Sequence, residues 1–99
     1  MSEPLPETQI ERALADMPGW SHAEGALRKR YTFSGFAEAM GFMVRVGFAA
    51  ERQNHHPQLT NVYHRVDVSL STHDAGDVVT ANDLELARAI EAIHRPASS

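Results

Sequence analysis

Residues 27–33 alternate between two kinds of side chain, and this pattern constrains the fold more than any other stretch. One set is large and mostly apolar and the other is polar: Leu27, Lys29, Tyr31 and Phe33 against Arg28, Arg30 and Thr32. A period of two predicts a β-strand with one face turned inward. The charged Lys29 departs from the pattern and is tolerable near a strand edge. The rest of the chain must therefore supply a sheet that is covered on one side.

Three other segments show helical spacing. Thr8 with Glu11 and Thr80 with Asp83 fit capping boxes, and Ser34 can cap the middle helix. The expected helices run from Thr8 to Pro18-Gly19, from Gly35 to Arg52, and from Thr80 to Arg95-Pro96. The residues expected to face inward are Ile10, Ala13, Leu14 and Met17, then Phe36, Met40, Met43, Gly47 and Ala50, widened by Phe42 and Val46, and finally Leu86, Ile90 and Ile93.

The remaining strands are shorter or less distinct. A short strand is expected at 20–22, followed by a turn at Glu24-Gly25. The β-branched run 61–72 can be divided into two strands by a tight turn at 63–65, and a loop follows at 74–77. The order is α-β-β-α-β-β-α. It predicts an α+β fold, with a four-stranded antiparallel sheet carrying three helices on one face.

Composition excludes several classes of function. The 99 residues suit a single domain (1–99), with loose ends at 1–7 and 95–99. The net charge of −4 gives no basic footprint for nucleic acid. The absence of cysteine removes disulfides, thiolate nucleophiles and cysteine-based zinc sites. No signal-peptide pattern opens the chain, and no apolar run approaches the roughly 20 residues needed to cross a bilayer. We expect a soluble, cytoplasmic domain with no membrane partner.

The stretch ERQNHHP, residues 51–57, places an acid, two adjacent histidines and a proline at the end of the second expected helix. A cationic imidazole there is favoured by the helix dipole by roughly 0.3–1 kcal/mol. This explains one histidine better than two. Glu51 alone reads as a solvated residue near a helix end, and Asp83 alone as a helix cap.

His73 closes the second β-branched run. Strand alternation places its side chain with Ser69 and Ser71, where it is either a hydrogen-bonded edge residue or part of a pocket mouth. The other three histidines are expected to be surface or turn residues: His22, His64 and His94.

Metal binding and proton transfer are the two chemistries open to these histidines. Adjacent residues on a regular element point apart, so His55 and His56 could share a metal only in irregular backbone. The acids that could join them, Glu51, Asp74 and Asp83, are scattered along the chain. Histidines titrating near neutral pH can instead divide proton donation and acceptance. We therefore favour acid–base work without a metal.

Taken together, these residues resemble the pterin-4a-carbinolamine dehydratase family. The similarity runs from about Trp20 to Ile93, and its strength lies in the order and spacing of short pieces. The pieces are Gly19-Trp20, Phe33, Gly41-Phe42-Met43-x-Arg45-Val46, Glu51 before His55-His56-Pro57, Asn61-Val62-Tyr63, Leu70-Ser71-Thr72-His73 and Asp83.

The resemblance implies the same fold and a specific reaction. That reaction is the dehydration of 4a-hydroxytetrahydrobiopterin to quinonoid dihydropterin, without metal or organic cofactor, which recycles the pterin of aromatic amino-acid hydroxylases. The catalytic residues implied are His55, His56 and His73, and which is acid and which is base stays open. The supporting or substrate-binding residues implied are Glu51, Asp83, Trp20, Pro57, Ser71 and Thr72.

Two departures and one rival reading accompany the resemblance. Leu59 stands where the family often has an aromatic residue, which leaves Trp20 as the expected aromatic neighbour, and the segment from His73 to Asp83 is one residue longer than in animal members. Animal members also act as dimerisation cofactors of a transcription factor, so a binding module of the same fold is the alternative. The resemblance, the small size and the Gly41/Gly47 helix suggest a homodimer or homotetramer.

Overall fold

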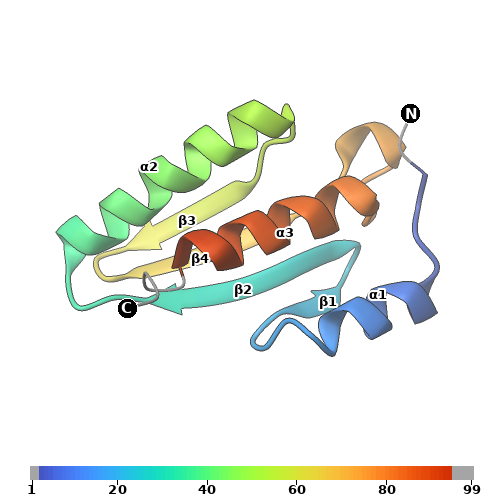
Figure 1. Ribbon diagram of the computed structural model, residues 1–99, viewed down its shortest axis with the longest axis horizontal. Coiled ribbons are helices and arrows are strands. Elements are labelled where there is room, and N and C mark those ends of the chain that lie inside the picture. The colour runs from blue at the N-terminus through green and yellow to red at the C-terminus, as the bar shows by residue number, and fades with distance from the viewer. Residues whose placement is uncertain (1–2, 95–99) are drawn as a thin grey trace.

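The computed structural model describes residues 3–94, and the order of elements is the expected one (Figure 1). The elements are α1 (Glu7–Leu14), β1 (Ser21–Ala23), β2 (Ala26–Thr32), α2 (Phe36–Gln53), β3 (Gln58–Val62), β4 (Arg65–Leu70), the 3₁₀ turn η1 (His73–Ala75) and α3 (Ala81–His94). The prediction of an α+β fold with three helices and a four-stranded antiparallel sheet is confirmed.

The strands follow the order β1-β2-β4-β3, and every neighbouring pair is antiparallel. Arg28 pairs with Ser69 and Arg30 with Asp67 across β2 and β4. Because side chains alternate along a strand, these residues share one face of the sheet. The opposite face carries buried residues such as Leu27, and the period of two in β2 therefore reports the two faces correctly.

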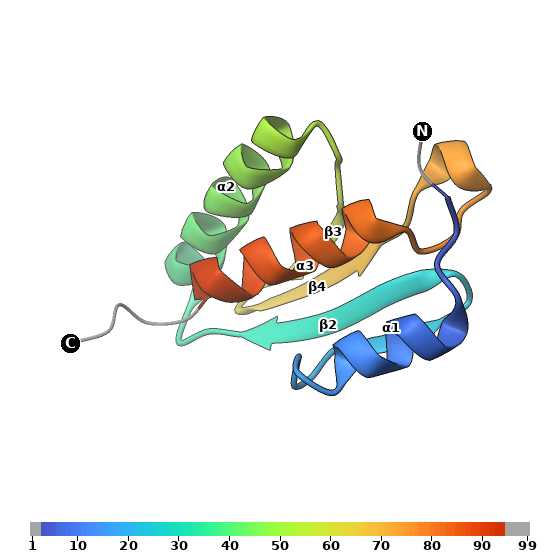
Figure 2. The ribbon, with the colours of Figure 1, turned by 45° about the vertical axis from the view of Figure 1, so that its right-hand side comes forward.

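The helices cover that buried face. Figures 1 and 2 show α2 and α3 lying across the same side of the sheet and α1 beside β1. Ile10 of α1 and Met17 after it join the same core as the strands. The fully buried residues at its centre are Leu27, Tyr31, Phe42, Val46, Val66, Val68, Leu70, Leu86 and Ile90. Within residues 3–94, none of the helices has the length and apolarity to cross a membrane.

Lys29 lies on the inner face of β2, away from the edge position that would best tolerate it. Its ammonium contacts Glu91 of α3 at 2.5 Å and donates to the Pro18 carbonyl at 2.9 Å. Trp20 Nε1 donates to the same Glu91 oxygen at 3.1 Å, and the Tyr31 hydroxyl donates to it as well. A buried charge needs such partners, and the exception to the strand pattern is therefore a satisfied polar cluster.

Two of the predicted helix caps are wrong. α1 begins after Pro6 rather than at Thr8, and no side chain caps it. Proline tolerates this place because its fixed φ suits a helix entry. α2 begins after Gly35, while the Ser34 backbone N–H bonds to Glu38. The capping box at α3 is confirmed, because the Thr80 N–H donates to Asp83 at 2.8 Å.

α2 is rotated relative to the expected stripe. Its buried residues are Ala39, Phe42, Val46, Ala49 and Ala50. Phe36 and Met40, which were expected to face inward, are 49% and 41% exposed. The helix is apolar on two sides, so its spacing alone did not fix the side that packs on the sheet. A Cβ added at Gly47 would meet nothing within 4 Å, so no backbone of residues 3–94 approaches there.

The strand limits also shift near the histidines. β3 begins at Gln58, directly after Pro57, rather than at Asn61, and the turn after Val62 divides the two strands as expected. β4 ends at Leu70. His73 therefore opens η1 and does not continue the strand, so strand alternation cannot place its side chain. Thr72 keeps only an isolated bridge to Val78.

Candidate active site

The end of α2 sets the direction of the two adjacent histidines. Asn54 takes the left-handed conformation, with φ of 53°, and its N–H bonds to carbonyls of the last turn. Asparagine tolerates this conformation better than most residues. The Gln53 side chain donates to the Asn82 carbonyl at 2.7 Å, which ties the end of α2 to the start of α3. His55 and His56 therefore leave the helix in irregular backbone beside α3.

His55 and Asp83 form a largely buried pair. His55 Nε2 lies 2.6 Å from Asp83 Oδ1, and the two side chains are 12% and 0% exposed. The second carboxylate oxygen accepts from the Thr72 hydroxyl at 2.7 Å and from the Thr80 N–H at 2.8 Å. Asp83 is thus both the cap of α3 and the partner of a histidine. The sequence suggested each role separately, and one side chain fills both.

The direction of each hydrogen bond in this group follows from counting donors. Ionised Asp83 only accepts, so the proton it shares with a neutral His55 lies on Nε2. His55 Nδ1 is then the basic nitrogen of the ring. Thr72 donates to Asp83, so the 2.7 Å contact between the threonine hydroxyls is donated by Thr80. Thr80 in turn accepts from the Asn82 N–H.

The other two candidate histidines pair with exposed acids. His56 Nε2 lies 3.0 Å from Glu51 Oε1, and both side chains are mostly exposed. His73 Nδ1 lies 2.9 Å from Asp77 Oδ1 in its own loop, and its side chain is 90% exposed. The hydrogen bond from His73 to Asp77 and the charge of that carboxylate raise the pKa of the imidazole above its ordinary value. Each candidate histidine thus has a carboxylate partner of its own.

The remaining predicted residues divide between this region and another. Thr72 is in the hydrogen-bonded group, and Pro57 and Ser71 adjoin it along the chain. Trp20 instead contacts Glu91 and Tyr31. Glu91 is eight residues beyond Asp83 on α3, about 12 Å along the helix axis.

Two residues that hydrogen-bond in this region were not expected there from the sequence. Gln53 links the end of α2 to the start of α3, and the Thr80 hydroxyl hydrogen-bonds to the Thr72 hydroxyl. The capping box signalled Thr80 as a helix start but not as part of a site. Nothing in the local sequence signals Gln53, because its partner is a backbone carbonyl 29 residues away.

The region contains the groups that proton transfer requires. A buried carboxylate fixes one ring nitrogen of a histidine and leaves the other free to exchange a proton. Among residues 3–94, no group of three or more histidine, cysteine or acidic side chains is arranged to hold a metal ion. The fold and the site together define an α+β domain with a carboxylate-oriented histidine.

Comparison with known proteins narrows this class. The sequence profile of the family described as pterin 4 alpha carbinolamine dehydratase matches residues 3–93. A relative from Opitutus terrae, named for this family, is 53% identical over 89 residues, which cover 90% of this chain and 92% of the relative. One from Rhodopseudomonas palustris, also so named, is 50% identical over 95 residues, covering 94% and 93%. The chain belongs to the pterin-4a-carbinolamine dehydratase family.

Solved structures show the same fold. The crystal structure of a transcriptional coactivator/pterin dehydratase from Brucella melitensis superposes with a TM-score of 0.87 at 36% identity, covering 93% of this chain and 99% of that one. A pterin dehydratase-like protein described as a RuBisCO assembly factor in the alpha-carboxysome gives a TM-score of 0.65 at 21% identity, covering 84% and 95%. The second likeness shows the fold alone.

Proposed function

We propose that this protein dehydrates a pterin-4a-carbinolamine such as 4a-hydroxytetrahydrobiopterin to the quinonoid dihydropterin. In this reaction the N5–H bond and the C4a–OH bond break, a C4a=N5 double bond forms, and water leaves. The observation that carries the proposal is the His55–Asp83 pair, in a chain that belongs to the dehydratase family. The chemistry needs a proton acceptor and a proton donor, which are roles that histidines fill near neutral pH.

The proposed division of labour follows from the surroundings of each histidine. His55 accepts the N5 proton at Nδ1, because ionised Asp83 supports the resulting imidazolium. His73 protonates the departing hydroxyl, because its raised pKa keeps it charged at higher pH. His56, supported by Glu51, is the third catalytic group. Ser71, Thr72 and Pro57 complete the proposed substrate site.

The proposed physiological role is pterin recycling. Quinonoid dihydropterin is a product that a reductase can return to the tetrahydro form used by an aromatic amino-acid hydroxylase, and neither the dehydration nor its proton transfers require a metal or an organic cofactor. A chain without cysteine suits the reducing cytosol, which is the proposed location.

We also propose that the protein self-associates through α2. Phe36, Met40, Val44 and Phe48 recur every four residues along this helix and are between 41% and 65% exposed. Residues four apart lie on one side of a helix, so they form a continuous apolar stripe opposite the face packed on the sheet. A second copy presenting the same stripe would cover it in a symmetric dimer or tetramer.

The alternative proposed function is a binding module that uses the same stripe. It is supported by the exposed apolar residues of α2 and by the coactivator description of the Brucella melitensis structure. The two functions separate in one experiment, an ultraviolet assay of 4a-hydroxytetrahydropterin breakdown. A dehydratase accelerates the decay above the spontaneous rate, and His55→Ala abolishes most of that acceleration. A pure binding module leaves the decay at the spontaneous rate.

A further inference from the structure

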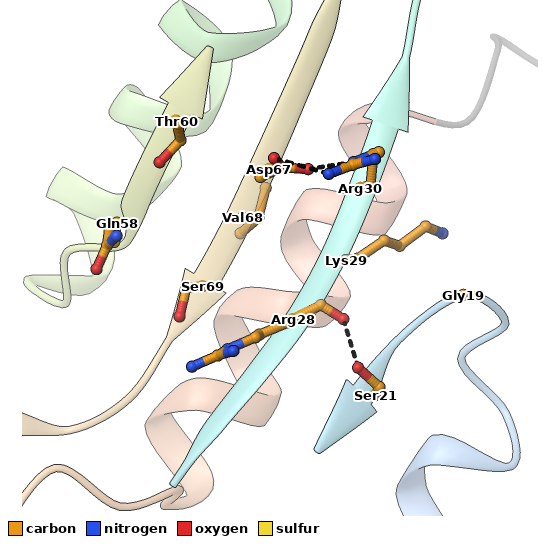
Figure 3. A pocket seen from close by; sticks show the side chains of 10 residues that line it. All are labelled: Gly19, Ser21, Arg28, Lys29, Arg30, Gln58, Thr60, Asp67, Val68 and Ser69. Atoms are coloured by element: carbon orange, nitrogen blue, oxygen red, sulfur yellow. Dashed lines mark hydrogen bonds and ion pairs between the residues drawn. The ribbon is translucent and has the colours of Figure 1, made fainter. Parts of the chain in front are cut away.

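The open face of the sheet is hollowed into a cavity of about 630 Å³ (Figure 3). The cavity is lined mainly by polar side chains from all four strands, among them Ser21, Arg28, Arg30, Gln58, Asp67 and Ser69. Binding sites for small molecules commonly measure roughly 300–1,000 Å³. The hollow therefore has the size of a ligand site, and its polar lining favours a polar ligand.

Two of the three cations that line the hollow are already neutralised. Arg30 and Asp67 meet through two contacts, Nε to Oδ1 at 2.7 Å and Nη2 to Oδ2 at 3.4 Å. This hydrogen bonding lowers the pKa of Asp67 and raises that of Arg30. The Lys29 side chain extends away from Arg28 in Figure 3, and its ammonium is bound by Glu91 and the Pro18 carbonyl.

Arg28 is the cation that stays available. Within residues 3–94 its one ion-pair partner is Glu24, at 3.3 Å in the turn between β1 and β2, and that side chain is 79% exposed. Exposed ion pairs of this kind contribute little to stability, so Arg28 can readily exchange the Glu24 carboxylate for another anion. Figure 3 shows the Arg28 guanidinium extending across the face toward β4, where Ser69 is its cross-strand neighbour. A guanidinium beside hydroxyl and amide groups is well suited to a phosphate or carboxylate.

The hollow adjoins the candidate active site along two strands. Ser69 lies two residues before Ser71, about 7 Å along an extended chain. Gln58 follows His56 by two residues and pairs with Ser69 across β3 and β4. Among the rows whose side chains lie on the open face of the sheet, the row of Arg28, Ser69 and Gln58 is therefore the one nearest the proposed pterin site. The chain as a whole carries a net charge of −4, so an anion approaching it needs such a local cation.

We propose that the hollow on the open sheet face binds a negatively charged side chain of the substrate pterin, with Arg28 as its principal contact. This inference rests on the proposed dehydratase function and narrows its substrate class from pterin-4a-carbinolamines in general to those that bear a phosphate or carboxylate on the side chain, in place of the uncharged side chain of biopterin. Arg28 is thus a residue that determines substrate specificity and takes no part in the proton transfers.

The test measures equilibrium binding, which does not depend on turnover. The probes are 6-hydroxymethyl-7,8-dihydropterin, which is neutral, and its phosphate monoester. The wild-type protein binds the ester about tenfold more tightly than the neutral probe. Arg28→Gln removes most of that difference and changes the affinity for the neutral probe by less than about twofold. Glu24→Gln, which frees the guanidinium, tightens binding of the ester by a few-fold.

Arg12→Gln is the matched control, because it removes one exposed arginine from α1 and causes the same change in net charge. Arg12→Gln leaves the difference in affinity between the two probes unchanged. If both arginine variants lowered this difference equally, the effect of Arg28 would be one of overall charge, and the proposal would be overturned. Equal affinity of the wild type for both probes overturns it too. Failure to bind either probe would contradict the proposed function itself, a result distinct from binding without discrimination.

Discussion

Asp83 accepts hydrogen bonds from an imidazole, a hydroxyl and a backbone N–H, so its replacement separates orientation from folding. Asp83→Asn keeps an oxygen for the cap of α3 but offers an amide N–H₂ group toward His55 or Thr72. We expect kcat to fall about 10- to 10³-fold, because the ring nitrogen that should accept the proton is no longer fixed. The measurement is kcat across pH, with circular dichroism to confirm the fold.

Glu85→Gln is the control for this variant, since Glu85 is exposed and lies on α3 two residues after Asp83. It should change kcat by less than about twofold. A folded Asp83→Asn protein with the wild-type kcat and pH profile would show that Asp83 serves α3 alone and that His55 needs no partner.

The three candidate histidines should each affect the rate. Alanine variants of His55, His56 and His73 are expected to lose about 10- to 10³-fold, and a double variant less than the product of the singles, because the groups share one step. His22→Ala and His94→Ala should stay within about twofold in activity. The His94 and Tyr31 ring centroids lie 4.7 Å apart, so the thermal unfolding midpoint of the His94→Ala variant is measured as well.

The sequence could indicate which residues are candidates for the site where they form a motif, but it could not predict which of them pair with one another. The run from Glu51 to Pro57 and the capping box at Asp83 contain the residues that pair in the structure, His55 with Asp83 and His56 with Glu51. That Asp83 meets His55, 28 residues away, depends on how α2 and α3 pack. His73 was placed by strand alternation, which fails because β4 ends before it.

At the scale of elements, the exposed stripe of α2 should control self-association. Phe48→Glu places a charge on its most exposed member and should shift the protein toward monomer, because burying an unpaired carboxylate in an apolar interface is costly. Sedimentation at micromolar concentration measures the change. Tyr63→Glu removes an equally large apolar side chain at the β3–β4 turn and should leave the mass unchanged. A wild-type protein that sediments only as a species near 10.9 kDa would contradict association altogether.

The types of the elements followed from sequence more reliably than their limits or orientation. Helical spacing indicated the three helices of residues 3–94, while the period of two in β2, the β-branched run and the turn residues indicated the four strands. The entries of α1 and α2 were misjudged because Thr8 and Ser34 are good caps that the chain does not use. The rotation of α2 was missed because Phe36 and Phe42 are equally apolar, and only packing decides between them.

At the scale of the whole molecule, Glu91 joins segments that are far apart in sequence. Burial alone would raise the pKa of its carboxyl, but hydrogen bonds from Lys29, Tyr31 and Trp20 outweigh burial and hold it below the ordinary 4.5. A lowered folded-state pKa adds stability above pH 4.5, and this stability is lost as the pH falls through the folded value. Acid therefore weakens the connection between α3 and the β1–β2 edge.

Glu91→Gln should lower the free energy of unfolding at pH 7 by about 1–3 kcal/mol. The difference from wild type should shrink as the pH falls from 4.5 through the lowered folded-state pKa of Glu91, because below that pKa both proteins lack the charge. Denaturant unfolding at several pH values measures it. Glu85→Gln, on an exposed position of the same helix, should have little effect at any pH. A Glu91→Gln loss that is constant with pH would assign the effect to packing rather than to charge.

Long-range contacts were beyond the reach of the sequence. Trp20 was expected as an aromatic neighbour of the histidines, yet its indole bonds to a residue 71 positions away. Lys29 departs from the strand pattern in the sequence, and its pairing with Glu91 of α3 explains the departure. Both depend on the register of α3 over β2, which no local pattern in either element specifies.

Metal-free acid–base catalysis by His55 can be tested through the ultraviolet decay of 4a-hydroxytetrahydropterin with chelator-treated protein, verified to be free of metal. We predict that the treated wild type accelerates the decay as well as the untreated protein, since histidine proton transfer needs no Lewis acid. Folded His55→Ala should lose most of the acceleration. A large loss on chelation that zinc restores, or full activity of His55→Ala, would contradict acid–base catalysis by this histidine.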